Sequence, residues 1–248
     1  MDAVCFLKDF NFYMKNNNQL SNETETAGTL SVVATPIGNL EDMTYRAVRV
    51  LGEADYVLCE DTRVTGKLCA HYNLDVKLRR YDAHASERVH EEILADLASG
   101  KQIALVSDAG TPGVSDPGVL LIAAARTAGV RIDAIPGASA VTAAVSIAGL
   151  TGNQFSFLGF VPQKKGRQTF FADLEAYDHP VVFFESTHRI MKTLEALQNS
   201  PIDWTIRVGR ELTKMHEEML IGTAGELYAL LEAEPVKQKG EFVVIVSK

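Results

Sequence analysis

The sequence predicts an α/β protein built of two domains. From residue 30 onward, short β-branched segments alternate with segments of helical period, which is typical of a parallel sheet covered by helices. Turns rich in glycine and proline follow several of the predicted strands. The composition of the chain changes after residue 149, where an aromatic segment and a basic loop follow. We therefore expect α/β domains at residues 29–150 and 151–248, preceded by a disordered extension at residues 1–28.

Composition limits the function classes. Of the 248 residues, 46% are hydrophobic and 23% are charged, which is enough for a sizeable core. The net charge of -8 excludes a polycationic surface, so any contact with nucleic acid has to use a local basic patch. The three cysteines form no C-x-x-C pair, which predicts a reducing, cytoplasmic location and neither a disulfide framework nor a zinc site.

Neither a targeting segment nor a membrane span is expected. The first thirty residues are polar, and the longest apolar runs are interrupted by Arg126 or by the Pro136–Gly137 pair. The segment after Met14 is rich in asparagine and threonine and has no period, which predicts disorder. Met14 is an alternative start of the protein.

The first predicted domain contains strands and helices in alternation. A helix begins at Ser86, and its apolar positions recur on one face until Gly100 ends it. Pro117 suits the first turn of a second helix over residues 118–128, which Gly129 ends. Strands are expected at residues 30–34, 56–59, 103–107 and 130–135. This order predicts a parallel sheet.

The second predicted domain has a different composition. An aromatic segment at residues 155–160 precedes a basic loop at residues 161–168. Thr223 and Glu226 have the spacing of a capping box, which predicts the start of a helix. Further strands are expected at residues 181–184, 204–208 and 242–246, and helices at residues 187–197 and 223–231.

Four turns rich in glycine or proline follow strands of the first domain. They are TPIGNLED (35–42), EDTRVTGK (60–67), SDAGTPGVSDPG (107–118) and PGASA (136–140). In an open parallel sheet, ligands bind beyond the carboxyl ends of the strands, where all four turns fall. Proline stiffens such a loop and glycine lets its backbone approach a ligand closely. The turns therefore indicate a site for a small polar ligand.

Several common motifs are absent from these turns. The chain lacks the G-x-G-x-x-G fingerprint of dinucleotide-binding proteins, and Gly66–Lys67 lacks the upstream glycine of a phosphate-binding loop. The PGASA turn lacks the second glycine of a nucleophile elbow. No metal-ligand spacing occurs, so no metal site is predicted.

The motifs as a set resemble a known family. VVATPIGNLEDMTYRAVRVL, CEDTRVTGKL, ALVSDAGTPGVSDPG, PGASA, FLGFVPQKKGR, VFFESTHRI, RELTKMHEE and KGEFVVIV occur in this order between residue 30 and the C-terminus. They are similar to the small-subunit ribosomal RNA methyltransferase I family, which belongs to the tetrapyrrole methylase superfamily. TPIGNL and SDAGTP separate this branch from enzymes that act on tetrapyrroles.

The resemblance implies two α/β domains of the tetrapyrrole methylase type, with the cofactor in the cleft between them. It implies S-adenosylmethionine as methyl donor and 2′-O-methylation of a cytidine ribose in the decoding region of 16S rRNA. It also implies a homodimer. The residues that the motifs place at the cofactor are Pro36, Asp108, Thr111, Val114, Ser139, Ala140, Glu185, Glu211, Gly240 and Glu241.

Some positions depart from the family pattern. Ala138 stands where the family often has a proline, and the segment at residues 81–87 replaces a common one that contains histidine and asparagine, so His84 carries no assigned role. Some relatives continue beyond the last strand, whereas this sequence stops at Lys248, which predicts a different or weaker grip on RNA. Two alternatives stay open: a methyltransferase of the same fold with a tetrapyrrole or another small acceptor, and a non-catalytic, ribosome-associated protein that binds the cofactor.

Methylation of a ribose hydroxyl gains from a base that removes its proton, typically by about 10²–10⁴-fold. Acidic residues at strand ends are the candidates: Glu60, Asp61, Glu185 and Glu211. Each also has a structural interpretation. Glu60 and Asp61 would cap the next turn, Glu185 would pair with Arg189, and Glu211 would pair with Arg210 or Lys214.

RNA binding requires local positive charge. The basic loop carries Lys164, Lys165 and Arg167, and KLRR at residues 77–80 is a second basic cluster. Arginine also suits phosphate because its fork binds in a bidentate manner. The predicted RNA contacts are Arg63, Lys164, Lys165, Arg167, Arg189 and Arg210.

Overall fold

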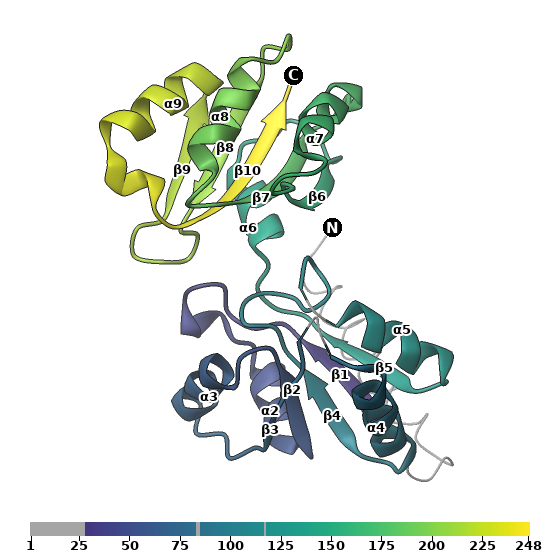
Figure 1. The fold of residues 1–248 in the computed structure, drawn as a ribbon. Coiled ribbons are helices and arrows are strands. Elements are labelled where there is room, and N and C mark those ends of the chain that lie inside the picture. Colours follow the sequence, from purple (N-terminus) through teal and green to yellow (C-terminus); the bar gives the residue numbers. More distant parts are fainter. Residues whose placement is uncertain (1–27, 83–84, 117) are drawn as a thin grey trace, which may run out of the picture.

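The computed structural model describes residues 28–82, 85–116 and 118–248. The expectations for the N-terminal extension, for His84 and for Pro117 lie outside these residues. Two five-stranded sheets lie one above the other (Figure 1). None of the helices in the described ranges is both long and apolar enough to cross a membrane.

The first sheet is entirely parallel, as the alternation of strands and helices predicts. Its strand order is β3-β2-β4-β1-β5. The strands are β1 (Thr29–Val33), β2 (Tyr56–Cys59), β3 (Leu78–Arg80), β4 (Gln102–Leu105) and β5 (Arg131–Ile135). All four residues of β2 are buried, because helices cover both faces of the sheet.

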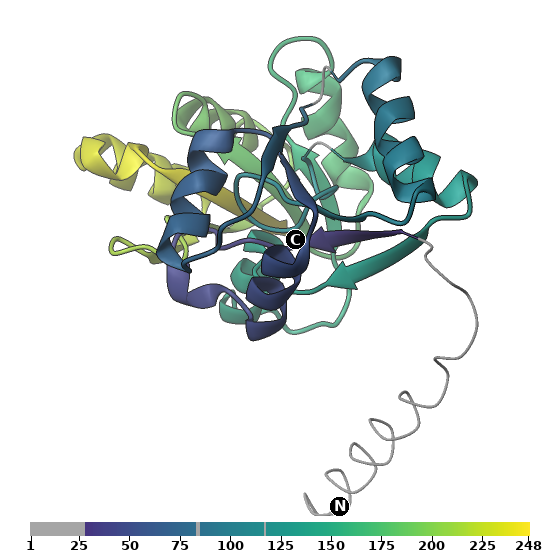
Figure 2. The same cartoon turned by 90° about the horizontal axis from the view of Figure 1, so that it is seen from below.

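Two pairs of helices lie on opposite sides of the first sheet (Figure 2). On one side are α2 (Tyr45–Glu53) and α3 (Thr62–His71), and on the other are α4 (Glu87–Ala98) and α5 (Val119–Thr127). Successive residues of the strands face opposite sides, so that Ile103 packs with α4 and Ala104 with α2. The sequence patterns predict α4 and α5 but not α2, α3 or the short edge strand β3.

The second sheet is mixed, with the strand order β6-β7-β10-β8-β9. Its strands are β6 (Ser156–Phe160), β7 (Val181–Ser186), β8 (Thr205–Arg210), β9 (Glu218–Gly222) and β10 (Glu241–Ser247). The β10 strand lies antiparallel between β7 and β8, and only β6 and β7 are parallel. The last strand of the chain therefore occupies the centre of this sheet.

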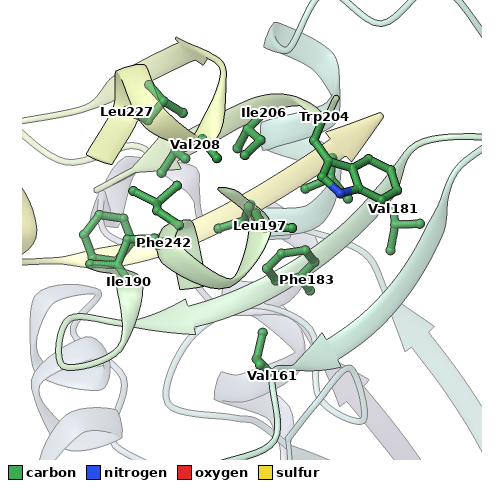
Figure 3. Packing of buried hydrophobic residues seen from close by; sticks show 14 of the residues in the cluster. Val161, Val181, Phe183, Ile190, Leu197, Trp204, Ile206, Val208, Leu227 and Phe242 are labelled. Carbon is green, nitrogen blue, oxygen red and sulfur yellow. The ribbon is translucent and has the colours of Figure 1, made fainter. Parts of the chain in front are cut away.

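One face of the second sheet is covered by α8 (Ile190–Gln198) and α9 (Ala224–Ala233). Phe183, Val208 and Phe242 point from three neighbouring strands into the core that Figure 3 shows. The capping box at the start of α9 is confirmed, since Thr223 and Glu226 cap each other's backbone. Shorter elements are α7 (Arg167–Asp173) and the 3-10 turns η1 (Leu40–Asp42), η2 (Leu174–Ala176) and η3 (Pro235–Gln238).

The other face of the second sheet is covered by α6 (Ala140–Ile147), a helix that the sequence patterns miss. Val141 and Ala144 of α6 pack against Val243 and Ile245 of β10. By its packing α6 belongs with the second sheet, although it precedes the predicted boundary at residue 150. Ile37, from the turn after β1, joins the same cluster and ties the two sheets together.

Candidate active site

A cavity of about 470 Å³ lies between the two sheets. The turns after β1, β4 and β5 form its wall on the first sheet, and the ends of β6 and β7 and the start of β10 form its wall on the second. This is the edge at which parallel α/β sheets bind ligands. A larger groove of about 530 Å³ runs along the face of β1 and β5. It lies beside the strands rather than at the turns, and ion pairs such as Arg49–Glu53 line it.

The turns of the first wall are fixed by backbone hydrogen bonds. The Thr35 N–H donates to the Gly110 carbonyl at 2.9 Å, and the Gly110 N–H donates back to the Thr35 carbonyl at 3.0 Å. The Thr35 hydroxyl donates to Ser107, and the Thr111 hydroxyl donates to Ala138. Gly110 has a φ of 80°, which other residues rarely adopt. These hydrogen bonds and the conformation of Gly110 hold the turns after β1 and β4 in a rigid wall.

The cavity brings together eight of the ten residues predicted at the cofactor. They are Asp108, Thr111, Val114, Ser139, Ala140, Glu185, Gly240 and Glu241. Pro36 is buried behind the wall, and its neighbour Ile37 lines the cavity instead. Glu211 lies outside the lining and accepts a hydrogen bond from the Glu241 N–H at 2.9 Å, so that it supports a lining residue.

On the second wall, Glu185 is enclosed by donors. Its side chain is 0% exposed, and its oxygens lie 3.2 Å from an Arg167 nitrogen and 2.9 Å from an Arg189 nitrogen. The Thr193 hydroxyl donates to it at 2.6 Å and the Ser186 N–H at 2.7 Å. A carboxylate that accepts four hydrogen bonds and ion pairs has little capacity left for a substrate proton. The structure therefore argues against Glu185 as the base and supports its alternative interpretation as a partner of Arg189.

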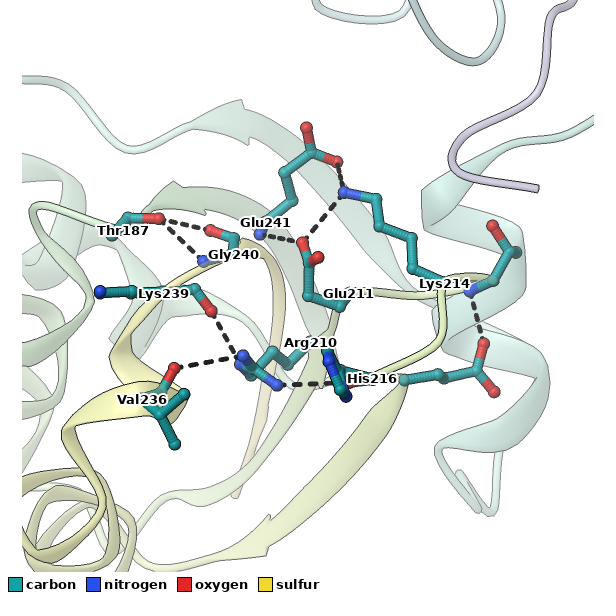
Figure 4. A network of polar contacts seen from close by, with 11 residues as sticks. Thr187, Arg210, Glu211, Lys214, His216, Val236, Lys239, Gly240 and Glu241 are labelled. Atoms are coloured by element: carbon teal, nitrogen blue, oxygen red, sulfur yellow. Dashed lines mark hydrogen bonds and ion pairs between the residues drawn. The ribbon is translucent and has the colours of Figure 1, made fainter. Parts of the chain in front are cut away.

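Glu211 is neutralised in a similar way (Figure 4). Lys214 lies 2.9 Å from it and also reaches Glu241 at 3.1 Å. Burial disfavours the charge on Glu211, but the hydrogen bonds from Lys214 and from the Glu241 N–H outweigh it and lower its pKa. The pairing with Lys214 agrees with the structural interpretation, and a low pKa makes Glu211 a weak base.

Asp61 follows β2, outside the lining of the cavity, and caps α3. Its carboxylate accepts the Arg63 N–H at 2.8 Å as the N-cap of α3, and it forms an ion pair with the Arg63 side chain. These bonds hold the pKa of Asp61 well below its usual range. The capping interpretation is therefore confirmed for Asp61, and its low pKa makes it a weak base too.

Two further carboxylates follow strands of the first sheet, Glu60 after β2 and Asp116 after β4, and both are poorly neutralised. Burial raises the pKa of Glu60, and the charges of Asp108 and Asp82 add to this effect. Burial raises the pKa of Asp116 to about 6; the Ser107 hydroxyl opposes the shift, while Glu60 and Asp108 increase it. Asp116 lines the cavity, although no motif in the sequence marks it as a site residue. Its only sequence signal is its place in the rigid turn after β4.

The six predicted RNA contacts fall into two groups. The side chains of Arg63, Lys164 and Lys165 are exposed and present their charge to solvent, and Arg63 also pairs with Asp61. Arg167 and Arg189 are only 17% and 18% exposed and bind Glu185. Their role is to hold the basic loop and the end of β7, so the structure argues against them as direct RNA contacts.

Arg210 is also too buried to contact RNA directly. It donates to the carbonyls of Val236, His216 and Lys239, which closes the segment before β10 (Figure 4). Its side chain is 8% exposed and forms an ion pair with Glu218. Burial of the whole guanidinium makes Arg210 a structural residue.

The chain matches a family model and several named relatives. The model of the Tetrapyrrole (Corrin/Porphyrin) Methylases matches residues 29–228. The chain belongs to this family. Ribosomal RNA small subunit methyltransferase I of Neisseria meningitidis serogroup B is similar to this methylase, with 42% identity over 229 residues, which is 92% of this chain and 79% of the relative. The protein of the same name from Thermotoga maritima is 40% identical over 220 residues, covering 89% of this chain and 98% of the relative.

Solved structures share the fold of this methylase. Cobalt precorrin-4 methyltransferase CbiF superposes with a TM-score of 0.67 at 17% identity, over 92% of this chain and 98% of that chain. Diphthine synthase superposes with a TM-score of 0.69 at 17% identity, over 89% and 90% of the two chains. At this identity the likeness concerns the fold alone, and it confirms the predicted fold class.

Proposed function

We propose that this chain transfers the methyl group of S-adenosylmethionine to the ribosomal RNA of the small subunit. The observation that carries the proposal is its identity of 40–44% to relatives named ribosomal RNA small subunit methyltransferase I, over about nine-tenths of its length. The membership in a methylase family and the cavity between the sheets support the same activity.

The cavity suits the methyl donor in size and in chemistry. Its volume lies within the roughly 300–1,000 Å³ that is usual for small-molecule sites. Val114, Phe160 and Phe184 offer apolar surface, and Asp108 and Glu241 offer carboxylates for hydroxyl and amino groups. The turns that hold Thr111 and Ser139 are fixed before a ligand arrives, which reduces the entropy lost on binding.

The finer proposal is that the acceptor is the 2′-hydroxyl of a cytidine in the decoding region of 16S rRNA. When bound, the donor supplies a methyl group on a sulfonium, and the leaving thioether is neutral. The protein then has to align the hydroxyl with the methyl group and accept a proton. Alignment of the two groups in a rigid cleft can raise the rate by several orders of magnitude. The exposed Lys164 and Lys165 would hold RNA phosphates at the rim of the cleft.

A cytoplasmic homodimer belongs to the same proposal. Exposed apolar side chains on the described surface, including Ile147 and Phe155, offer area for a second copy. Sedimentation at micromolar concentration tests the dimer, which predicts twice the mass of 27.1 kDa.

The decisive experiment is transfer of labelled methyl groups to small ribosomal subunits that lack their 2′-O-methyl mark. Naked 16S rRNA and a tetrapyrrole precursor serve as competing acceptors. We expect label on the subunit RNA at a ribose. Label only on the tetrapyrrole would place the chain among the small-acceptor enzymes, and no label with the donor still bound would make it a binding protein.

A further inference from the structure

A second, smaller cavity adjoins the cleft. It has a volume of about 170 Å³ and lies between the end of β3 and the start of α4 and α5. Asp116 lines both this cavity and the larger one. The two spaces therefore share one wall, and that wall carries a carboxylate.

The small cavity has apolar and aromatic walls. Val119 and Leu120, in the first turn of α5, line this cavity and are 56% and 69% exposed. Opposite them, Tyr81 is buried, and its hydroxyl lies 2.8 Å from His90 Nε2. This contact fixes Tyr81 and His90 as the floor of the cavity, and the exposed Val119 and Leu120 supply the apolar surface against which a flat ring can pack.

Its size fits part of a polymer rather than a whole small molecule. At about 170 Å³ it is below the roughly 300–1,000 Å³ of ordinary ligand sites, and the neighbouring cavity is already large enough for the methyl donor. A single base turned out of an RNA strand needs a space of this kind next to the reacting atoms.

The rim of the small cavity carries an exposed arginine. Arg80 ends β3, is 74% exposed, and lies 2.9 Å from Asp82, which lines the cavity. A phosphate group can bind the outward face of this guanidinium. Arg79 is instead paired with Glu92 on α4. Of the two arginines in the second basic cluster, Arg80 is thus the one placed to meet a strand entering the cavity.

Asp116 is the carboxylate best suited to accept a proton between the two cavities. Glu185 and Glu211 are saturated by cations, and Asp61 is bound by Arg63. The charged groups around Asp116 are the carboxylates of Glu60 and Asp108, both of which favour its protonated form. A carboxylate whose pKa lies near neutrality is a stronger base than one at its usual value.

We propose that the small cavity takes the base of the acceptor nucleotide, over Tyr81 and against Leu120, and that Asp116 is the general base. The inference rests on the proposed methyl transfer. In the step, the ribose 2′-oxygen forms a bond to the methyl carbon while the carbon–sulfur bond of the sulfonium breaks and its electron pair stays on sulfur. The hydroxyl proton passes to a carboxylate oxygen of Asp116 and then to solvent. The products are the methylated ribose and a neutral thioether.

The carboxylate is tested by comparing Asp116→Asn with Glu60→Gln under single-turnover conditions on subunits lacking the mark. We expect Asp116→Asn to lower the transfer rate by about 10²–10⁴-fold. Calorimetry on the same sample should still find the methyl donor bound, which shows that the variant is folded. Glu60→Gln should lose less than about tenfold. A rate in Asp116→Asn within about threefold of the native protein, or the larger loss in Glu60→Gln, would overturn the assignment.

The cavity is tested by the double change Val119→Ala and Leu120→Ala. Loss of the apolar packing surface should raise KM for the subunit by about tenfold, because less apolar area is buried against the base, and should leave the donor affinity unchanged. Ile221→Ala is the matched control, because Ile221 is 57% exposed on β9 of the other sheet. An unchanged KM in the double variant would overturn the cavity as the acceptor site.

The native protein in the same assay separates this inference from the proposed function. Native protein that labels the RNA while both sets of variants match it would refute the inference and leave the function standing. Native protein that binds the donor and labels no RNA would refute the proposed function, and the inference with it.

Discussion

The carboxylates of the two sheets that border the cleft have opposite electrostatic surroundings. On the second sheet, Glu185 and Glu211 are held by arginine or lysine, and their charge is balanced. On the first sheet, Glu60 and Asp116 lie near other carboxylates, and burial raises the pKa of both. The ion pairs of the second sheet therefore form a fixed frame for the cleft. The first sheet keeps a carboxylate available for proton transfer.

The largest effect is expected on stability, when the ion pairs of Glu185 on the second sheet are removed. Glu185→Ala leaves Arg167 and Arg189 buried without their partner, which should lower the free energy of unfolding by about 3–5 kcal/mol. Denaturant unfolding measures this loss. Glu195→Ala removes an exposed glutamate from α8 and should change stability by less than about 0.5 kcal/mol. Equal effects of the two changes would mean that the Glu185 network does not hold the second wall.

A smaller effect is expected at the basic loop that this frame supports. Lys164→Ala with Lys165→Ala should weaken RNA binding by about tenfold and make its dependence on salt shallower, because fewer phosphates are neutralised. The methyl donor should bind as before.

The matched control is Lys101→Ala with Lys248→Ala. It removes the same charge at the ends of β4 and β10 that lie away from the cleft. If both double variants lose RNA affinity equally, the effect reflects net charge, and the basic loop has no special part in binding.

The smallest expected effect is a gain in stability, and it comes from Asp116→Asn. Because the pKa of Asp116 in the folded protein is raised to about 6, its contribution to stability is present below about pH 4 and is lost as the pH rises through about 6. Asp116→Asn removes the ionised form. At pH 8 it should stabilise the fold by about 1 kcal/mol, allowing for partial exposure, and raise Tm by about 2–4 °C.

Thermal unfolding at two pH values checks this prediction. The gain of Asp116→Asn should disappear at pH 4, where the native carboxyl is already protonated. Asp203→Asn, at an exposed aspartate before β8, should be neutral at both pH values. A loss of stability at pH 8 would show that the Asp116 charge is well neutralised, and the contrast between the walls would fail.

Local patterns in the sequence predict much of this fold. The β2 strand matches its predicted bounds, and Ser86 lies at the N-cap of α4 as expected. Interactions over three or four residues are also readable, as the Glu185–Arg189 and Glu211–Lys214 pairs show. Each of these features depends on neighbours in the chain, whose spacing is fixed by helix or turn geometry.

Features that depend on distant segments are not readable from one sequence. The central place of β10 follows from pairing with β7 and β8, far away in the chain. Arg167 reaches Glu185 only because β6 lies beside β7, so a residue of the basic loop becomes an internal anchor. Asp116 likewise has no sequence signal for its raised pKa, which arises from burial and from Glu60 on another loop.

The pH dependence of methyl transfer tests the central claim most directly. The measurement is kcat/KM of the native protein on subunits that lack the mark, between pH 5 and pH 8.5, with donor binding measured at each pH. A base on the first wall predicts that kcat/KM falls about tenfold per pH unit below about pH 6, while the donor stays bound. A rate that stays constant down to pH 5 would contradict the claim that a carboxylate of this wall accepts the proton.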